Sequence, residues 1–267
     1  MMQYSFHALT DPGLVRSNNE DALVFDAACG LAILADGMGG YNAGEVASGM
    51  ATTYVHTELG RWISSQGGSS PNPKQTASAI ERCVDDANLS ILKAADANPN
   101  YFGMGTTIVV GVFQGPRLIL GHVGDSRCYR LRDGALEQIT KDHSMLQEQV
   151  DAGLLTVEQA AVAPGRNLLT RALGVEESSK AEIHEHVVKS GDIYVMCSDG
   201  LNDMVSDKDI ALVLISNHSL AGMATELVAR ANANGGRDNV SVLLTQATSW
   251  ASKPGLMSRI FGKPPSH

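Results

Sequence analysis

The chain has 267 residues, of which 43% are hydrophobic, and it carries a formal net charge of −9. This length and this apolar share are sufficient for one large core or two small ones. The acidic balance disfavours nucleic acid as a partner, because proteins that bind it usually present a basic face, and no apolar run is long enough to span a bilayer.

The N-terminal part of the chain predicts strands followed by two helices. Residues 3–10 and 21–36 have the patterning of strands, and the polar segment 11–19 forms the loop between them. Apolar residues at helical spacing predict helices over residues 44–65 and 74–96, with a loop rich in glycine, serine and proline between them.

The next part changes from helical to strand-like patterning. Short apolar runs are separated by turn residues, of which Asp133-Gly134 is a typical hairpin signal. The runs cover residues 106–113, 117–123, 127–132 and 136–139. This order predicts an antiparallel meander and not a βαβ repeat.

The C-terminal part combines short helices, strands and a pair of longer helices. Capping-box patterns at Ser144 and Thr156 predict two short helices within residues 144–163. The remaining strands are expected near 181–188, 192–198 and 239–246, and the remaining helices near 207–216 and 220–233. Helices in pairs between antiparallel strands predict helices layered outside a β-sandwich.

The cysteines and the ends of the chain bear on its location. The four scattered cysteines lack CxxC spacing, so we expect reduced thiols and neither a zinc site nor a disulfide framework. The first residues lack the basic and apolar segments of a signal peptide, so we expect a cytoplasmic protein. Residues 249–267 contain lysine, arginine and proline but no acid, and we expect a mobile tail there.

Two apolar runs end abruptly in an Asp-Gly pair. The first ends in Asp36-Gly37, with further glycines at 39 and 40, and the second ends in Asp199-Gly200. Two such pairs indicate carboxylates gathered at one edge of a fold, which is how a hard metal ion is held. The alternative is that each aspartate caps a turn, since Asp and Gly both favour turns. The two pairs alone leave both interpretations open.

Other acids also stand next to predicted strands and helices. Asp238 lies just before the last strand, and Glu20 and Asp21 lie just before an early one. Asp142 precedes a helix that is expected to begin after Ser144. Each acid can be explained locally, as a helix stop, a solvated loop or a helix entry. Together they place acids at strand termini from the start, the middle and the end of the chain.

Eight short motifs, several of which contain these acids, follow one another along the chain. They are Arg-x-x-Asn-Glu-Asp at 16–21, Ala-Asp-Gly-Met-Gly-Gly at 35–40, Gly-Thr-Thr at 105–107, Val-Gly-Asp-Ser-Arg at 123–127, Asp-His-Ser at 142–144, Leu-Thr-Arg-Ala-Leu-Gly at 169–174, Ser-Asp-Gly-Leu at 198–201 and Gly-Arg-Asp-Asn-Val-Ser at 236–241. In this order they resemble the metal-dependent, type 2C serine/threonine protein phosphatases in their compact bacterial form. The match runs from about residue 3 to residue 246.

The resemblance implies an α+β fold, with a central antiparallel β-sandwich flanked by pairs of helices on both faces in four αββα layers. It also implies a phosphatase domain over residues 1–248, a flap at about 145–166 that borders the substrate groove, and a tail at 249–267. The implied activity is hydrolysis of phosphoserine and phosphothreonine in proteins by a metal-activated hydroxide. The implied partners are phosphorylated proteins, among them a serine/threonine kinase and its targets, and we expect a monomer.

The resemblance further implies a site for two Mn²⁺ or Mg²⁺ ions, with a third ion in bacterial members. In this pattern Asp36 bridges the two ions, and the carbonyl of Gly37 binds one of them. Asp199 and Asp238 bind the other. Mg²⁺ and Mn²⁺ prefer oxygen ligands of this kind, and two ions can share one hydroxide and orient it for attack on phosphorus.

Further residues surround these ions in the family pattern. Asp21 belongs to the metal site, while Glu20 and Asn239 lie around it and hold waters or neighbouring groups. Arg16 matches the arginine that binds the substrate phosphate, since a guanidinium gives phosphate two parallel hydrogen bonds. The resemblance therefore implies three catalytic residues, namely Arg16, Asp36 and Asp199.

The third ion and the proton donor involve other positions. Asp142 matches a ligand of the third ion, shared with Asp199 and assisted by Asp203. The chain departs from the family pattern at Met38 and Tyr41, where relatives can carry histidine. The group that protonates the leaving alkoxide is therefore open between a metal-bound water and Tyr41.

Two other functions compete with this one. A catalytically inactive binding domain should have lost a core acid, whereas Asp36, Asp199 and Asp238 are all present. A phosphodiesterase or nuclease could use the same two-metal chemistry, but the acidic charge and the lack of a basic stripe disfavour it.

Overall fold

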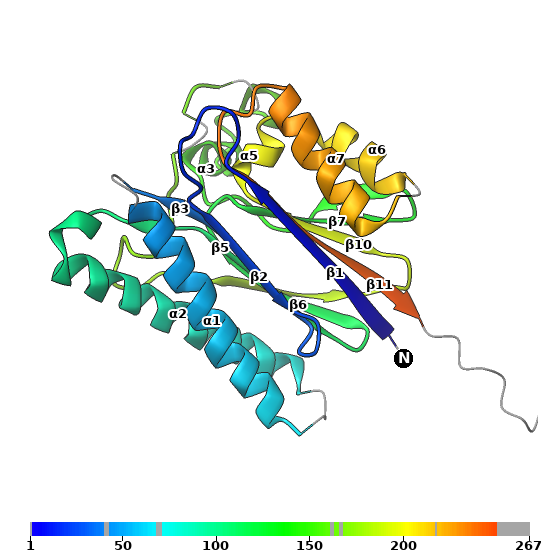
Figure 1. Ribbon diagram of the computed structural model, residues 1–267, viewed down its shortest axis with the longest axis horizontal. Helices are drawn as coiled ribbons and strands as arrows, with labels where there is room; N and C mark the ends of the chain where they lie inside the picture. Colours follow the sequence, from blue (N-terminus) through cyan, green and yellow to red (C-terminus); the bar gives the residue numbers. More distant parts are fainter. Residues whose placement is uncertain are drawn as a thin grey trace, which may run out of the picture.

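Two antiparallel sheets form the centre of the computed structural model, which describes residues 2–39, 43–67, 71–160, 163–165, 168–216 and 218–249 (Figure 1). One sheet contains, in spatial order, β1 (Met2–Asp11), β11 (Val240–Ser249), β10 (Ile193–Cys197), β7 (Arg127–Arg132) and β8 (Ala135–Gln138). The other contains β2 (Asp21–Asp26), β3 (Leu31–Met38), β5 (Ile108–Gln114), β6 (Arg117–Val123) and β9 (Glu182–Val187), and the short β4 (Gly105–Thr106) pairs with β3.

Helices cover the outer faces of the two sheets. On one side lie α1 (Ala43–Ser65) and α2 (Pro73–Ala97), and on the other lie α6 (Asp207–Ile215) and α7 (Leu220–Ala233) (Figure 1). The shorter helices are η1 (Pro99–Tyr101), α3 (Met145–Asp151), α4 (Val157–Ala160) and α5 (Asp199–Asn202). Within the described residues, no helix has both the length and the apolar character needed to cross a membrane.

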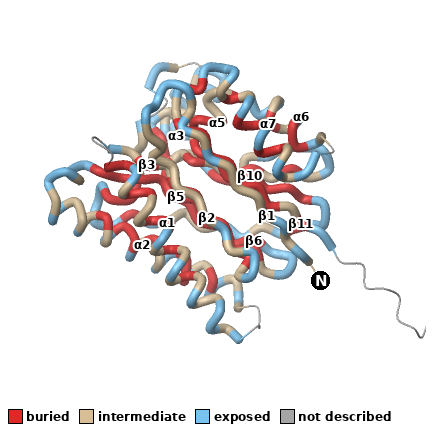
Figure 2. The backbone as a smooth tube through the Cα atoms, viewed as in Figure 1, coloured by how far each residue is buried: buried red, intermediate tan, exposed pale blue. Residues whose placement is uncertain are grey.

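Three clusters of buried side chains pack between the helices and the sheets and between the two sheets. In β3, Leu31 and Ile33 pack with α1 and α2, while Ala32 and Leu34 pack between the two sheets. Because side chains of a strand alternate between its faces and both faces of β3 are covered, its first five residues are all apolar. The third cluster joins β7, β10 and β11 to α5, α6 and α7. The layers are therefore helices, sheet, sheet and helices, and Figure 2 shows buried residues concentrated along the inner strands.

The predicted α+β class is confirmed, and the expected helices and strands correspond to observed elements. One expectation was wrong in detail, because residues 21–36 form two strands, β2 and β3, and not one. The carboxylate of Asp26 accepts hydrogen bonds from two backbone N–H groups of the turn between them. Gly30 ends that turn with a φ of 65°, and a Cβ there would lie 2.4 Å from the carbonyl oxygen of Phe113.

The predicted flap contains α3 and α4. Ser144 caps α3 by accepting the N–H of Gln147 at 3.3 Å. Thr156 and Gln159 form a complete capping box at the start of α4, with distances of 2.8 and 3.2 Å. Residues 161–162 and 166 of the flap and 250–267 of the tail lie outside the described residues, so the domain boundaries and the tail stay predictions.

Candidate metal centre

The β2–β3 pair brings two of the predicted acids face to face. Asp21 is the first residue of β2 and is the register partner of Asp36 in β3. Oδ2 of Asp21 accepts a hydrogen bond from the Ser198 hydroxyl at 2.8 Å. Oδ1 is buried and has no hydrogen-bond partner among the described residues. Burial raises the pKa of Asp21 to about 6, because the charged form loses its hydration.

Asp199 joins this pair from the other sheet. It begins α5 directly after β10, and the N–H of Ser198 donates to the carbonyl of Ser241 in β11 at 3.2 Å. A Cβ at Gly200 would lie 2.0 Å from the carbonyl oxygen of Asn239, so the close approach of these turns requires glycine. The approach brings Asp199 close to the aspartate that precedes Asn239.

The carboxylates repel one another in these partly buried surroundings. The pKa of Asp36 lies well above its ordinary value, first through burial and then through the charges of Asp21 and Asp199. The pKa of Asp199 is also raised, by burial and then by Asp125 and Asp203. Crowded buried charges of one sign are unfavourable without a counter-charge. This set of carboxylate oxygens, one of them unpartnered, therefore fits a hard divalent cation.

Backbone contacts fix the turn that carries Asp36 and Gly37. The carbonyl of Asp36 accepts a hydrogen bond from the Thr106 hydroxyl at 2.8 Å. The N–H of Gly37 donates to the carbonyl of Glu20 at 3.1 Å, and a Cβ at Gly37 would lie 2.2 Å from the carbonyl oxygen of Gly44 in α1. Only glycine fits between β3 and α1 at this point. Its carbonyl as a metal ligand stays a prediction.

Asn239 organises the loop that precedes β2. Its side-chain oxygen accepts the N–H of Glu20 at 2.8 Å, and its Nδ2 donates to two loop carbonyls at 3.0 and 2.8 Å. The loop carries Arg16 to the rim of the centre, where Nη2 lies 2.7 Å from Oδ2 of Asp238. The side chain of Arg16 is 50% exposed, so part of the guanidinium faces solvent.

Asp125 also lines the site, although it was not predicted as a ligand. It follows β6 after Gly124, whose φ is 104° and whose Cβ would lie 2.6 Å from Cγ2 of Thr107. Burial, and then the charge of Asp142, raises the pKa of Asp125 to about 7. The signal was present in the Val-Gly-Asp-Ser-Arg motif, because an apolar strand ends there in glycine and an acid, in the order Gly-Asp.

A cavity of about 340 Å³ extends from Asp199 toward the flap. Its walls include the acids predicted for a third ion, Asp142 and Asp203, together with Asp125 and Asp207, and residues of α3 and α4 close one side. The structure thus gathers the predicted third-ion residues beside the main acid cluster.

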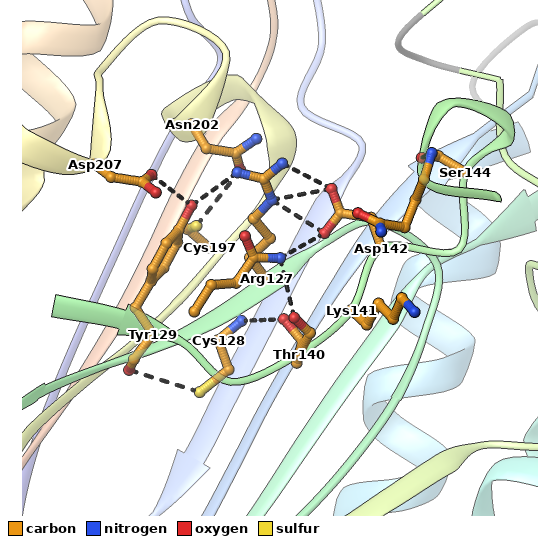
Figure 3. A network of polar contacts seen from close by, with 12 residues as sticks. Arg127, Cys128, Tyr129, Thr140, Lys141, Asp142, Ser144, Cys197, Asn202 and Asp207 are labelled. Carbon is orange, nitrogen blue, oxygen red and sulfur yellow. Dashed lines mark hydrogen bonds and ion pairs between the residues drawn. The ribbon is translucent and has the colours of Figure 1, made fainter. Parts of the chain in front are cut away.

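Asp142 is held in a network of polar contacts (Figure 3). Nε of Arg127 lies 3.1 Å from both carboxylate oxygens, and its Nη2 lies 2.7 Å from Oδ2. Gln138 donates to Oδ1 at 2.8 Å. Nη1 of Arg127 donates to the hydroxyl of Tyr129, and this hydroxyl donates to Oδ1 of Asp207. The charge of Asp142 is thus balanced by Arg127, and its role as a metal ligand stays a prediction.

Of the two positions where relatives can carry histidine, the structure describes only Met38. Met38 lines a small cavity of about 120 Å³ together with Arg171 and Val175. Tyr41 lies outside the described residues. The predicted alternatives for the proton donor therefore stay open.

Two sheets between helices, with partly buried carboxylates gathered near the ends of strands, are the arrangement of a metal-dependent hydrolase. Comparison with known proteins specifies it further, since the family model described as protein phosphatase 2C matches residues 15–245. This chain belongs to that family, as the motifs indicated.

Relatives and solved structures agree with this assignment. The serine/threonine protein phosphatase PstP of Mycobacterium tuberculosis is 40% identical over 92% of this chain, and the chain spans only 45% of its length. The serine/threonine phosphatase stp of Listeria monocytogenes is 36% identical, over 89% of this chain and 93% of its own length. A structure of the catalytic domain of PstP in complex with two manganese ions has a TM-score of 0.82 at 36% identity, covering 93% of this chain and 100% of that chain.

Proposed function

We propose that this chain hydrolyses phosphoserine and phosphothreonine in proteins with the aid of divalent cations. The observation that carries the proposal is the convergence of Asp21 in β2, Asp36 in β3 and Asp199 at the start of α5 into one partly buried group whose pKa values are raised. Such a group is unfavourable by itself and becomes favourable when cations bind. Family membership supplies the reaction class.

Asp36, Asp199 and Asp238 are the residues that would hold two ions, with the carbonyl of Gly37 beside Asp36. We propose Mn²⁺ or Mg²⁺, since the ligands are oxygen atoms, and a relative's structure holds two manganese ions. A third ion would fit the adjoining cavity, near Asp142 and Asp199. When bound, such ions lower the pKa of water and neutralise charge on a transferring phosphoryl group.

Arg16 would bind the substrate phosphate at the rim. Its guanidinium now pairs with Asp238 and is half exposed. With a cation bound at Asp238, that carboxylate would be neutralised, and the Arg16 guanidinium would be free to make two parallel hydrogen bonds to phosphate oxygens. Residues of α3 and α4 in the flap line the adjoining cavity, and there they would contact the protein substrate.

The residues beside Asp199 do not supply a nucleophile. Cys197 is fully buried and its pKa is raised by burial, so the thiolate needed for attack is disfavoured. The Ser198 hydroxyl donates to Asp21 and is also fully buried. Direct attack by water, without a phosphoenzyme, is the mechanism that these contacts support.

We further propose that the partners are phosphoproteins, including a serine/threonine kinase and its targets, and that the chain works as a cytoplasmic monomer. An inactive binding domain is disfavoured because the core acids are present and lie together. A nuclease is disfavoured by the net charge of −9.

Hydrolysis assays with and without Mn²⁺ test the function directly. We expect release of phosphate from a phosphothreonine peptide in Mn²⁺, loss of release after chelation, and far slower cleavage of a phosphodiester. Metal-independent turnover, or a preference for the diester, would contradict the proposal.

A further inference from the structure

Two buried histidines lie behind the acidic cavity. His122 is in β6, three residues before Asp125, and His143 directly follows Asp142. Their rings are stacked, with centroids 4.7 Å apart and planes 14° apart. His122 is fully buried and His143 is 7% exposed. Neither ring is therefore open to a substrate.

Each histidine holds the backbone of the other's turn. Nε2 of His122 lies 2.8 Å from the carbonyl oxygen of Lys141, so this nitrogen carries the hydrogen and donates it. Nδ1 of His143 accepts the backbone N–H of Gly124 at 3.1 Å. The backbone N–H of His143 donates to the carbonyl of Gly124 at 3.0 Å. Lys141 and Gly124 are the residues that immediately precede the two acids, so these bonds join the acid-bearing turns in both directions.

We propose that His122 and His143 are positioning residues that clasp the Asp125 turn to the Asp142 turn, and so hold the two carboxylates at a fixed spacing on the wall of the acidic cavity. This rests on the proposed metal-dependent function, because the spacing matters only if the cavity receives a cation. Like charges in buried surroundings repel each other, so a restraint is needed to keep both acids in place. Groups that orient ligands in this way typically change metal affinity by about 10- to 100-fold when removed.

Glu182 anchors the clasp from β9. Because Nδ1 of His143 accepts a hydrogen bond, its Nε2 carries the hydrogen, and this nitrogen faces Oε2 of Glu182 at 3.3 Å. The other carboxylate oxygen of Glu182 lies 2.6 Å from Nε2 of His184. Both ring nitrogens of His143 are thus engaged, which fixes the orientation of its ring.

The described residues around this clasp do not form a metal site of their own. His122, His143 and Glu182 bring possible ligand atoms within 4.8 Å of one another, and their types suit zinc. However, imidazole lone pairs lie in the ring plane, and stacked, nearly parallel rings do not direct them at one point. A guanidinium nitrogen of Arg171 also lies 3.0 Å from Nε2 of His143, where it would repel a cation.

Asparagine and glutamine at the two positions test the clasp, because they reproduce different ring atoms. A glutamine side-chain nitrogen reaches about as far as histidine Nε2, and an asparagine side-chain oxygen reaches about as far as Nδ1. His122→Gln and His143→Asn should therefore keep the bonds, whereas His122→Asn and His143→Gln should lose them. His184→Gln is the matched control, because His184 contacts Glu182 but belongs to neither of the two turns.

Two measurements follow on the full chain: Mn²⁺ binding by calorimetry, and amide hydrogen exchange of Gly124 and His143 in metal-free protein. We expect His122→Asn and His143→Gln to bind the Mn²⁺ ion of lowest affinity at least about tenfold less tightly than wild type and to exchange these amides faster. In the other variants, the affinity for Mn²⁺ and the exchange rates should stay within about threefold of wild type. The clasp predicts that glutamine is the better replacement at position 122 and asparagine at position 143. If the histidines only filled space, the same residue would be the better replacement at both positions. Equal binding and equal protection in all four variants would overturn the clasp.

The outcomes separate the clasp from the proposed function. A wild-type chain that binds Mn²⁺ but hydrolyses no phosphothreonine peptide would overturn the proposed function. In that case the opposite preference for glutamine at position 122 and asparagine at position 143 would still support the clasp. Normal amide protection in His122→Asn and His143→Gln would overturn the clasp even if the wild-type chain is an active phosphatase.

Discussion

Nη2 of Arg16 lies 2.7 Å from Oδ2 of Asp238, and this contact joins the loop before β2 to the residues before β11. One partner is the group proposed to bind phosphate, and the other is a group proposed to bind a cation. A cation at Asp238 weakens the ion pair, because it neutralises the carboxylate. We therefore expect metal and substrate to bind cooperatively at this contact.

Replacement of Arg16 tests its role in phosphate binding. Hydrogen bonds to charged groups contribute about 1.5–3 kcal/mol, so Arg16→Ala should lower kcat/KM for a phosphothreonine peptide by roughly 10- to 100-fold. Arg16→Lys should recover only part of this loss, because an ammonium cannot bind phosphate through a planar fork. Unfolding by urea should change by less than about 1 kcal/mol, since exposed ion pairs contribute little. Full activity in the lysine variant would count against the assignment.

Asp36→Asn should separate activity from stability. We expect Mn²⁺-dependent activity to fall by about 100-fold or more, as when a main transition-state contact is removed. The melting temperature in EDTA should rise, because the neutral amide relieves the repulsion that raises the pKa of Asp36. Thermal unfolding with and without Mn²⁺ measures both effects. Glu81→Gln, at an exposed position on α2, is the control and should change neither quantity.

Local patterns predicted the helices and strands because burial imposes their period directly on the sequence. The same reasoning singled out Asp36 and Asp199 as candidate ligands, since Asp36 follows five apolar residues within β3 and Asp199 stands two residues after the apolar strand β10. Asp125 was not predicted as a ligand because its Gly-Asp pair is also typical of a turn between two strands of the meander. The turn after Asp26 was missed for a different reason, because apolar residues continue on both sides of it.

Pairings between distant segments could not be derived from local patterns. The contact between Arg127 and Asp142 depends on how β7 and β8 pair and on where the chain runs after β8. The stacking of His122 on His143 depends on β6 and the turn after β8 meeting in space. Local patterns therefore drew attention to the acids, whereas the arginine that pairs with Asp142 and the stacked histidines became apparent only from the fold.

The stability of the metal-free protein should fall as pH rises from about 6.5 to 8. The pKa of Asp125 is raised from 3.8 to about 7, and that of Asp21 to about 6. The folded state therefore binds more protons than the unfolded state in this range, so the free energy of unfolding decreases with pH. His143 has the opposite effect at lower pH. Because its pKa is lowered from 6.5 to about 4, its contribution makes the free energy of unfolding increase as pH rises from about 4 to 6.5.

Urea unfolding in EDTA across this pH range measures the effect. Asp125→Asn should flatten the dependence, since it removes the group that titrates nearest to pH 7. Mn²⁺ should stabilise the protein more at pH 8 than at pH 6.5, because ligand carboxylates must be deprotonated to bind it. Stability that rises with pH in EDTA would contradict this account.

The ion pair of Arg127 with Asp142 should contribute more to stability than an exposed pair of the same type. Arg127 engages both carboxylate oxygens, and the two side chains are 24% and 13% exposed. Arg127→Lys should lower the free energy of unfolding by about 1.5–3 kcal/mol, because the bidentate bonds to a charged group are lost. Arg117→Lys is the matched control, since Arg117 and Glu185 are 50% and 45% exposed, and should change it by less than about 1 kcal/mol. Equal effects of both substitutions on urea unfolding would contradict the prediction.

Two glycines give a direct test of the close packing around Asp36. A Cβ at Gly37 would lie 2.2 Å from the carbonyl oxygen of Gly44, so Gly37→Ala forces backbone to move and should destabilise the metal-free protein by at least about 2 kcal/mol. Gly49 lies in α1, and a Cβ there meets no described atom within 4 Å. Gly49→Ala should therefore stabilise the protein by roughly 0.5–1 kcal/mol, because alanine has less backbone freedom to lose in a helix. Urea unfolding of both variants, and Mn²⁺ binding by calorimetry, measure the contrast. If Gly37→Ala matched wild type in both measurements, the turn would not require glycine, and a main support of the proposed metal centre would be lost.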